Sequence, residues 1–198
     1  RGAFNFDGIQ LRPDAPAKII QPFQTMSLVH AEAAWAMIKD NMEKHRVRKA
    51  TWEEAECVSN LVFPRKANGQ IRPCSDLTTV NRYTIDDPTP IPSVEDVLRS
   101  LDPRARVFAV LDLLWGFWQI PATERAQRRL CFYAPDGSLY TWTVMPFGAK
   151  NAPAHFRNWM LHLMERLPRR IAQYFDDLHF QATTVDELLT ELEATVDI

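Results

Sequence analysis

The sequence has no apolar run close to the roughly 18 residues that a membrane-spanning helix requires, and it does not begin with a signal-peptide pattern. Cysteine is also scarce. The three cysteines, Cys57, Cys74 and Cys131, are odd in number and widely spaced, which argues against a disulfide framework and against a zinc site. We therefore expect a protein of a reducing intracellular compartment, without assigning it to cytoplasm, nucleus or organelle.

A strong excess of basic residues is missing as well, since the formal net charge is −2. Residues 176–198 contain seven acids and no Lys or Arg, which leaves 23 bases against 18 acids in residues 1–175. A modest basic surface on that part is compatible with nucleic-acid binding. With 198 residues and 46% hydrophobic content, we expect one large domain or two small lobes. Because the first residue is Arg1, we expect a piece of a longer protein.

Two adjacent carboxylates stand between short apolar runs near the end of the sequence. Residues 171–180 read Ile-Ala-Gln-Tyr-Phe-Asp-Asp-Leu-His-Phe. This pattern predicts two strands with Asp176 and Asp177 in the tight turn between them. Aspartate is common in turns, so a purely structural β-turn is one interpretation. A divalent-cation site is the other, because two like charges this close repel each other and Mg²⁺ prefers oxygen ligands.

A third carboxylate, Asp112, lies in an apolar segment. Residues 107–113 read Val-Phe-Ala-Val-Leu-Asp-Leu, which predicts a strand buried on both faces. An ionised aspartate in such a strand is costly to bury unless it is paired or bound to metal, and no basic residue follows nearby. The alternative is an aspartate at the exposed end of the strand. Three carboxylates from two separate strands could together hold two metal ions, an arrangement that polymerases and nucleases use for in-line displacement at phosphorus.

These segments resemble the reverse transcriptases of gypsy-type long-terminal-repeat retrotransposons and retroviruses. Residues 174–177 match the Tyr-x-Asp-Asp box of that family, and residues 111–121 match its first catalytic motif. Residues 145–153, Met-Pro-Phe-Gly-Ala-Lys-Asn-Ala-Pro, are close to a third signature. The resemblance implies that the catalytic residues are Asp112, Asp176 and Asp177. It also implies that these aspartates bind two Mg²⁺ ions, or Mn²⁺ in their place.

Residues 61–74 predict a β-hairpin with an Asn-Gly turn. In the resembled family this segment is the fingers hairpin, whose basic residues close on the triphosphate of the incoming nucleotide. The corresponding residues are Arg65, Lys66 and Arg72, of which Arg72 matches best, and a guanidinium suits phosphate oxygens. The alternative is that these residues are solvated charges on an exposed ribbon.

Three further residues are implied in nucleotide binding by the resemblance. Phe117 corresponds to the steric gate, where an aromatic ring crowds a ribose 2′-hydroxyl and so favours deoxynucleotides. Phe147 and Gly148 correspond to the wall against which the templating base pair stacks. For Phe117 a simple core position is the alternative, because most aromatic side chains are buried.

The expected fold class is α+β, with reverse-transcriptase-like fingers and palm, an antiparallel palm sheet backed by helices, and no thumb. We expect an extended N-terminal arm over residues 1–26, mainly fingers over 27–106 and mainly palm over 107–198. The palm portion would contain the catalytic hairpin 171–182 and a C-terminal helix over 184–196. A capping pattern at Thr184 and Glu187 predicts the start of that helix.

The predicted function is that of an RNA-directed DNA polymerase, a nucleotidyltransferase that acts on a primed RNA or DNA template with deoxynucleoside triphosphates. The alternative is a retroelement-derived domain without polymerase activity that serves as a structural subunit or protein-interaction module. Departures from the family pattern favour that alternative. They are Trp115, where the family commonly has a small residue, and His179 and Gln181, where it prefers apolar ones.

Overall fold

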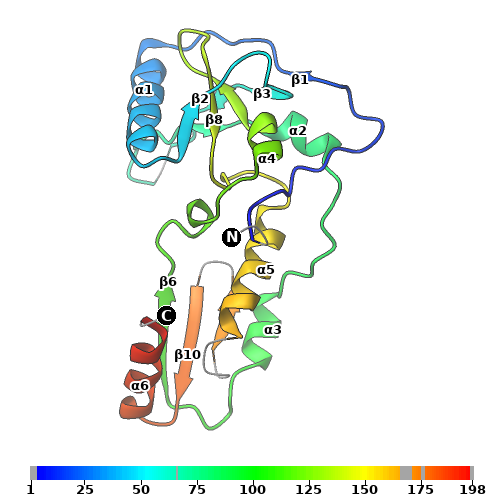
Figure 1. The fold of residues 1–198 in the computed structure, drawn as a ribbon. Helices are drawn as coiled ribbons and strands as arrows, with labels where there is room; N and C mark the ends of the chain where they lie inside the picture. Colours follow the sequence, from blue (N-terminus) through cyan, green and yellow to red (C-terminus); the bar gives the residue numbers. More distant parts are fainter. Residues whose placement is uncertain (1–3, 66, 166–170, 175–176, 197–198) are drawn as a thin grey trace. The chain divides into compact units, whose positions relative to one another are not determined.

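The computed structural model describes residues 4–65, 67–165, 171–174 and 177–196. Helices and strands are mixed along these residues (Figure 1), which confirms the predicted α+β fold class. The contacts divide the chain into two compact units. Unit 1 comprises Arg1–Asp87 with Phe117–Ala152, and unit 2 comprises Pro88–Gly116 with Pro153–Ile198. Each unit is therefore assembled from two segments that are distant in the sequence.

Unit 1 is built around a five-stranded sheet. Its elements are β1 (Ile19–Ile20), α1 (Leu28–Glu43), β2 (Val47–Lys49), β3 (Cys57–Ser59), β4 (Leu61–Val62), β5 (Cys74–Ser75), α2 (Thr78–Tyr83), α4 (Glu124–Arg129), β7 (Cys131–Tyr133) and β8 (Leu139–Trp142). The strand order is β1-β3-β7-β8-β2, with β1, β3 and β7 parallel and the remaining pairs antiparallel. Strands β4 and β5 form a separate antiparallel ribbon.

The cysteines of unit 1 belong to its apolar interior. Cys131 packs in a buried cluster with Val58 and Leu139, and Cys57 is also fully buried. Burial raises the pKa of the Cys57 thiol to about 12 and that of Cys131 to about 11. Both thiols therefore stay protonated at neutral pH and act as small apolar side chains.

The described part of the N-terminal stretch, residues 4–26, contains no helix and pairs with unit 1 at several points. The Phe6 side chain is fully buried, and its backbone N–H donates to the carbonyl oxygen of Pro121 at 2.7 Å. Next to it, the Asp7 carboxylate accepts a hydrogen bond from Thr123 and forms an ion pair with Arg125. These contacts fix the stretch along unit 1 although it has little regular structure of its own.

Unit 2 contains a three-stranded antiparallel sheet in the order β6-β10-β9. Its elements are α3 (Val94–Arg99), β6 (Val107–Asp112), β9 (Ala172–Tyr174), β10 (Asp177–Ala182) and α6 (Val185–Val196). The 3₁₀ helix η1 (Gly116–Gln119) and helix α5 (Ala152–Met164) each run across a boundary between the two units. Helix α6 packs against β10 and β6, and the Thr184 hydroxyl accepts from the Glu187 N–H at its start, as the capping pattern predicts.

The two faces of the unit 2 sheet differ in burial. Leu178 and Phe180 on β10 are 2% and 1% exposed, whereas Phe108 and Val110 on β6 are 57% and 55% exposed. The prediction that residues 107–113 form a strand buried on both faces is therefore wrong. Period-two alternation governs β6, because its residues at even numbers leave the core while those at odd numbers are half-buried.

None of the helices in the described ranges is long and apolar enough to span a bilayer.

Candidate active site

The carboxylates of unit 2 are brought together by strand register. Asp112, the last residue of β6, lies directly opposite Asp177, the first residue of β10. Residues directly opposite in an antiparallel pair have Cβ atoms about 4.5–5.5 Å apart and point to the same face. Asp177 is thus a strand residue and not part of the turn, contrary to the sequence prediction, because β10 pairs with β6 and β9 from its first residue. Asp176 lies outside the described residues.

The environment of this pair suits a divalent cation. Asp112 is exposed and Asp177 is half-buried, and within the described part of the chain neither carboxylate forms an ion pair or hydrogen bond. Among the described residues, no group of three His, Cys, Asp or Glu side chains is arranged to hold a metal ion. The two carboxylates supply the hard oxygen donors that Mg²⁺ takes, usually together with substrate phosphates. The donor set that is described therefore fits such an ion.

Two polar residues share the carboxylate face of β10, since they follow Asp177 at steps of two. Gln181 is 5% exposed; its side-chain oxygen accepts from the Asp102 N–H at 2.7 Å and its amide donates to the Ser100 carbonyl at 3.4 Å. A polar side chain is therefore needed at Gln181, because it binds backbone groups of the turn that follows α3. His179 is different, because its Nε2 is buried and has no hydrogen-bond partner among the described residues.

His179 also lines an apolar pocket of about 180 Å³ between α3 and the sheet. Leu98 of α3 and Phe108 and Val110 of β6 are among the other lining residues. The pocket lies on the same sheet face as the carboxylate pair, because Val110 and Asp112 are two residues apart on one strand.

Trp115 follows β6 in a left-handed backbone conformation, with φ 57°, and its side chain is 42% exposed. Such a conformation is uncommon for a bulky residue and is found where the surrounding structure imposes it. The departure from the family pattern at Trp115 therefore coincides with a backbone outlier that immediately precedes η1.

In unit 1 the predicted hairpin is present. Strand β4 pairs with β5, a further bridge joins Arg65 to Ile71, and Gly69 has φ 81°, as an Asn-Gly turn requires. The Arg72 N–H donates to the Pro64 carbonyl at 2.9 Å, and the Arg72 guanidinium lies over the Phe147 ring, with its Cζ 4.4 Å from the ring centroid. Arg65 is exposed, and Lys66 lies outside the described residues.

The other predicted nucleotide-binding residues are Phe147 and Gly148, which share one loop, and Phe117, which lies in η1. The Phe117 and Phe147 rings are stacked, with centroids 5.4 Å apart and an interplanar angle of 27°. Gly148 has φ 87°, a left-handed value that glycine adopts without strain. Asn81 fixes this loop, because its side-chain amide donates to the Gly148 carbonyl at 2.9 Å and its oxygen accepts from the Lys150 N–H at 3.0 Å.

A pocket of about 270 Å³ opens beside this loop in unit 1. Its lining combines Phe147 and Gly148 with residues of the hairpin and of the start of α2, among them Cys74 and Asp76. Hydrogen bonding from Thr78, and also from Gln21, holds the pKa of Asp76 below its ordinary value although burial opposes this. The Asp76 carboxylate that lines this pocket is therefore negatively charged at neutral pH and already accepts hydrogen bonds from Thr78 and Gln21.

Sequence reasoning missed Gln21, which connects the N-terminal stretch to the hairpin base. Its side-chain oxygen accepts from the Asn60 N–H at 2.7 Å. Its amide donates to the Thr79 hydroxyl at 3.1 Å and to the Asp76 carboxylate at 3.3 Å. No local pattern marks Gln21, because its partners are 39 to 58 residues away along the chain.

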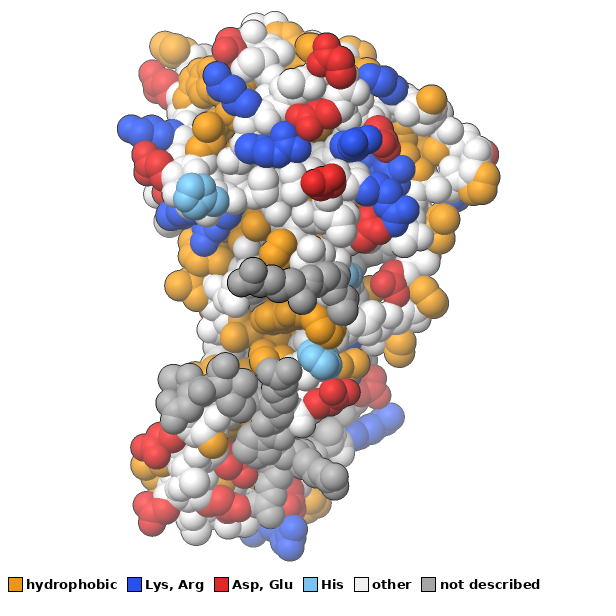
Figure 2. Space-filling view, viewed as in Figure 1, with side chains coloured by type: hydrophobic (Ala, Val, Ile, Leu, Met, Phe, Trp, Pro, Cys, Tyr) orange, Lys and Arg blue, Asp and Glu red, His pale blue; other side chains and the backbone are white. Residues whose placement is uncertain are grey.

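The predicted site residues thus form two groups. Arg72, Phe117, Phe147 and Gly148 lie together in unit 1, and Asp112 and Asp177 lie together in unit 2. Acidic and basic side chains are interspersed over the face of unit 1 seen in Figure 2, so no large single-sign patch covers that face.

Comparisons with known proteins agree with these motifs. A family model described as reverse transcriptase (RNA-dependent DNA polymerase) matches residues 64–197. The chain is 32% identical over 137 residues to a retrovirus-related Pol polyprotein from transposon 297 of Drosophila melanogaster, which covers 67% of this chain and 13% of that protein. It is 32% identical over 142 residues to the Gag-Pro-Pol polyprotein of human T-cell leukemia virus 2, covering 66% of this chain and 10% of that protein.

A third relative is polyprotein P3 of Commelina yellow mottle virus, 30% identical over 151 residues, with 76% of this chain and 8% of that protein covered. The chain therefore spans only about a tenth of the length of these relatives. Among solved structures, a foamy viral protease-reverse transcriptase in complex with double-stranded DNA superposes with a TM-score of 0.83 at 24% identity. That superposition covers 98% of this chain and 32% of the other, so the fold is shared.

Proposed function

The chain belongs to the reverse transcriptase family, and on that premise we propose that it is the fingers–palm part of an RNA-directed DNA polymerase. It adds deoxynucleotides to the 3′-hydroxyl of a primer that is paired with a template. The observation that carries the proposal is the cross-strand pair of Asp112 and Asp177, two carboxylates on one face of the sheet with no described ion pair.

The roles of the residues follow from their chemistry. Asp112 and Asp176 would ligate divalent cations, which reverse transcriptases generally use, and Asp177, opposite Asp112, would assist. The chemistry supplied at these carboxylates by two Mg²⁺ ions, or Mn²⁺, would be a lowered pKa of the attacking hydroxyl and stabilisation of the charge that develops at phosphorus. In unit 1, Arg72 binds the triphosphate together with Arg65 and Lys66, since a guanidinium pairs well with phosphate oxygens. Phe117 excludes a ribose 2′-hydroxyl, and Phe147 with Gly148 supports the templating base pair.

The proposed partner is a primer–template duplex. Two solved relatives of this fold are described as complexes with double-stranded DNA and with an RNA/DNA hybrid. Backbone phosphates supply most of the affinity in such complexes, so binding falls as salt concentration rises. Acidic and basic side chains are mixed on the face of unit 1 seen in Figure 2, so this face offers no large basic surface to a duplex.

The test is Mg²⁺-dependent incorporation of a labelled deoxynucleotide on a primed RNA template. Asp112→Asn keeps the size of an exposed side chain but removes its charge, and we expect at least about a 100-fold loss of incorporation. Asp186→Asn, which removes an exposed carboxylate from α6 of the same unit, is the matched control and should retain activity. Equal incorporation by both variants would refute the catalytic assignment.

A second candidate function is that of a protein-interaction module without polymerase activity. It is favoured by the exposed apolar face of Phe108, Val110 and Leu98, which lines the pocket beside His179. Under this proposal the wild-type protein and Asp112→Asn give the same background signal, and neither binds duplex at low salt.

A further inference from the structure

One aromatic ring in unit 1 contacts both predicted nucleotide-binding groups. The Arg72 guanidinium carbon lies 4.4 Å from the centroid of Phe147, and the Phe117 ring stacks on Phe147 with centroids 5.4 Å apart. Arg72, proposed to bind the triphosphate, and Phe117, proposed to exclude a ribose 2′-hydroxyl, therefore contact the same side chain.

The Arg72 side chain has no other described support. Among the residues that the structure describes, its guanidinium forms no ion pair and no hydrogen bond, so its donors remain available for phosphate oxygens. A free arginine side chain has many rotamers, and the loss of that freedom opposes binding. Stacking on an aromatic face restricts the guanidinium without using its N–H groups. Phe147 thus orients Arg72 before a nucleotide arrives.

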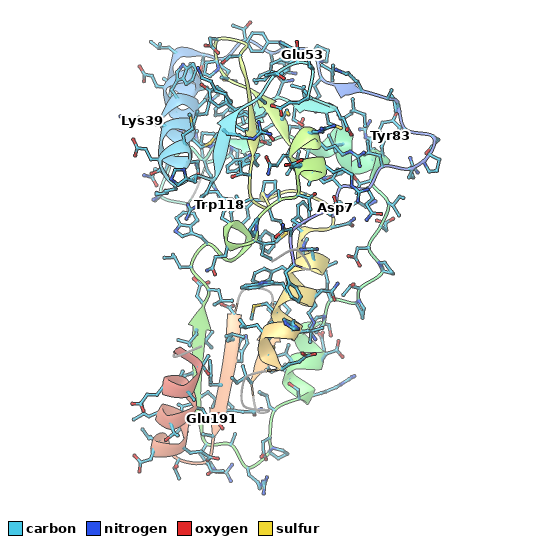
Figure 3. The ribbon with its side chains drawn as sticks, viewed as in Figure 1. Asp7, Lys39, Glu53, Tyr83, Trp118 and Glu191 are labelled. Carbon is cyan, nitrogen blue, oxygen red and sulfur yellow. The ribbon has the colours of Figure 1, made fainter. Side chains whose placement is uncertain are left out.

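Phe147 also packs against a chain of aromatic rings that begins with Trp118 and continues to Trp142. Trp118, labelled in Figure 3, meets Phe147 edge-on at 5.5 Å and stacks on Trp142 at 5.6 Å. The Trp142 indole N–H donates to the Ser75 hydroxyl at 3.0 Å in a buried hydrogen bond. The Arg46 guanidinium lies over the Trp118 ring, with its Cζ 4.8 Å from the ring centroid. The next residue along the chain, Gly148, is bound by Asn81.

We propose that Phe147 is a positioning residue that couples triphosphate binding by Arg72 to sugar selection by Phe117. This inference rests on the proposed polymerase function and goes beyond it. If the Phe147 ring is removed, Arg72 loses its cation–π contact and Phe117 loses its stacking contact at the same time. A ring that only fills the core would change stability without moving both substrate properties together.

The first experiment measures single-nucleotide incorporation with dTTP and with UTP. Phe147→Leu keeps an apolar side chain of similar volume but removes the aromatic face. We expect the KM for dTTP to rise about tenfold, with kcat changed by less than about threefold, because a stacked cation contributes that much orientation. The preference for dTTP over UTP should fall in the same variant, and Phe147→Tyr, which restores a ring, should rescue both properties.

A double variant separates positioning from a direct contact with the nucleotide. Once Arg72→Ala has removed the guanidinium, Phe147→Leu should raise the KM for dTTP little further. If the two residues acted independently, the fold-increases in KM caused by the two substitutions would multiply. An unchanged dTTP-to-UTP preference in Phe147→Leu, or fully multiplicative effects, would overturn the coupling. Thermal unfolding of each variant shows whether it has kept its fold.

If the wild-type chain does not incorporate nucleotides, that result refutes the proposed function but not the positioning role of Phe147. A binding measurement then tests the positioning role separately. Inorganic tripolyphosphate is titrated into each protein while tryptophan fluorescence is followed. We expect Phe147→Leu to weaken this binding as much as Arg72→Ala does, and Phe147→Tyr to leave it intact. Unaltered binding in Phe147→Leu would contradict the positioning role.

Discussion

In unit 2 the candidate catalytic groups are placed by backbone pairing, whereas in unit 1 the candidate nucleotide-binding groups are placed by side-chain packing. Asp112 and Asp177 face each other because β6 and β10 share a register that continues from Asp177 to Ala182. Arg72 and Phe117 meet on the ring of Phe147, and none of these three belongs to the five-stranded sheet. A carboxylate site thus tolerates side-chain changes that leave the ladder intact, whereas the aromatic site depends on individual rings.

The largest expected effect on stability comes from disturbing the buried face of the unit 2 sheet, opposite the face that carries Asp112 and Asp177. Phe180 is 1% exposed, so Phe180→Ala should destabilise unit 2 by about 3–5 kcal/mol through lost burial and a cavity. Val110→Ala, on the open face of the same sheet at 55% exposure, should cost less than about 1 kcal/mol. Urea unfolding with hydrogen exchange of the β6 and β10 amides tests this, and similar losses for the two variants would contradict the asymmetry of the sheet.

A smaller effect is expected from the amide network of unit 1. Gln21→Ala leaves part-buried partners at Asn60 and Thr79 unpaired and should cost about 2 kcal/mol. Gln24→Ala is the matched control, because the described hydrogen bond of Gln24 uses its backbone N–H, and its cost should stay within about 0.5 kcal/mol. Hydrogen exchange should report the loss in β3 and α2 while β10 keeps its protection. Loss of protection throughout both units would indicate that they unfold as one.

The smallest effect is electrostatic and again confined to unit 1. The pKa of Glu54 is held below its ordinary value of 4.5 by hydrogen bonds from Arg48, against the opposing effect of burial. A depressed carboxyl pKa stabilises the folded state above the unfolded pKa, and this contribution is lost as the pH falls through the folded pKa. The pair is partly exposed, so Glu54→Gln should cost at most about 1 kcal/mol near neutral pH.

Urea midpoints of the wild type and Glu54→Gln, compared at about pH 7 and about pH 3, measure this contribution. The difference between the two proteins should shrink at the lower pH, because protonation of Glu54 removes the charge that pairs with Arg48. A difference that stays constant between the two conditions would show that the pair contributes through packing alone.

Local features of the fold were predictable from the sequence because they depend on residues a few positions apart. The Asn68-Gly69 turn, the helix start at Thr184 and the strands on either side of residues 175–176 all follow from turn, capping and periodicity rules. The motif residues were predictable through the family resemblance, which the family model confirms for residues 64–197. What the resemblance implies about catalysis remains a proposal, and Asp176 and Lys66 lie outside the described residues.

The sequence by itself therefore determined the fold class, the turns and the identity of the candidate site residues, since these are written in short patterns. Only the tertiary structure decided that β6 is open on one face, that Asp177 is a strand residue opposite Asp112, and that Arg72 rests on Phe147. It also decided that Gln21 binds Asn60. The physical reason is that register and ring packing are fixed by contacts between distant segments, whose closure no local pattern encodes.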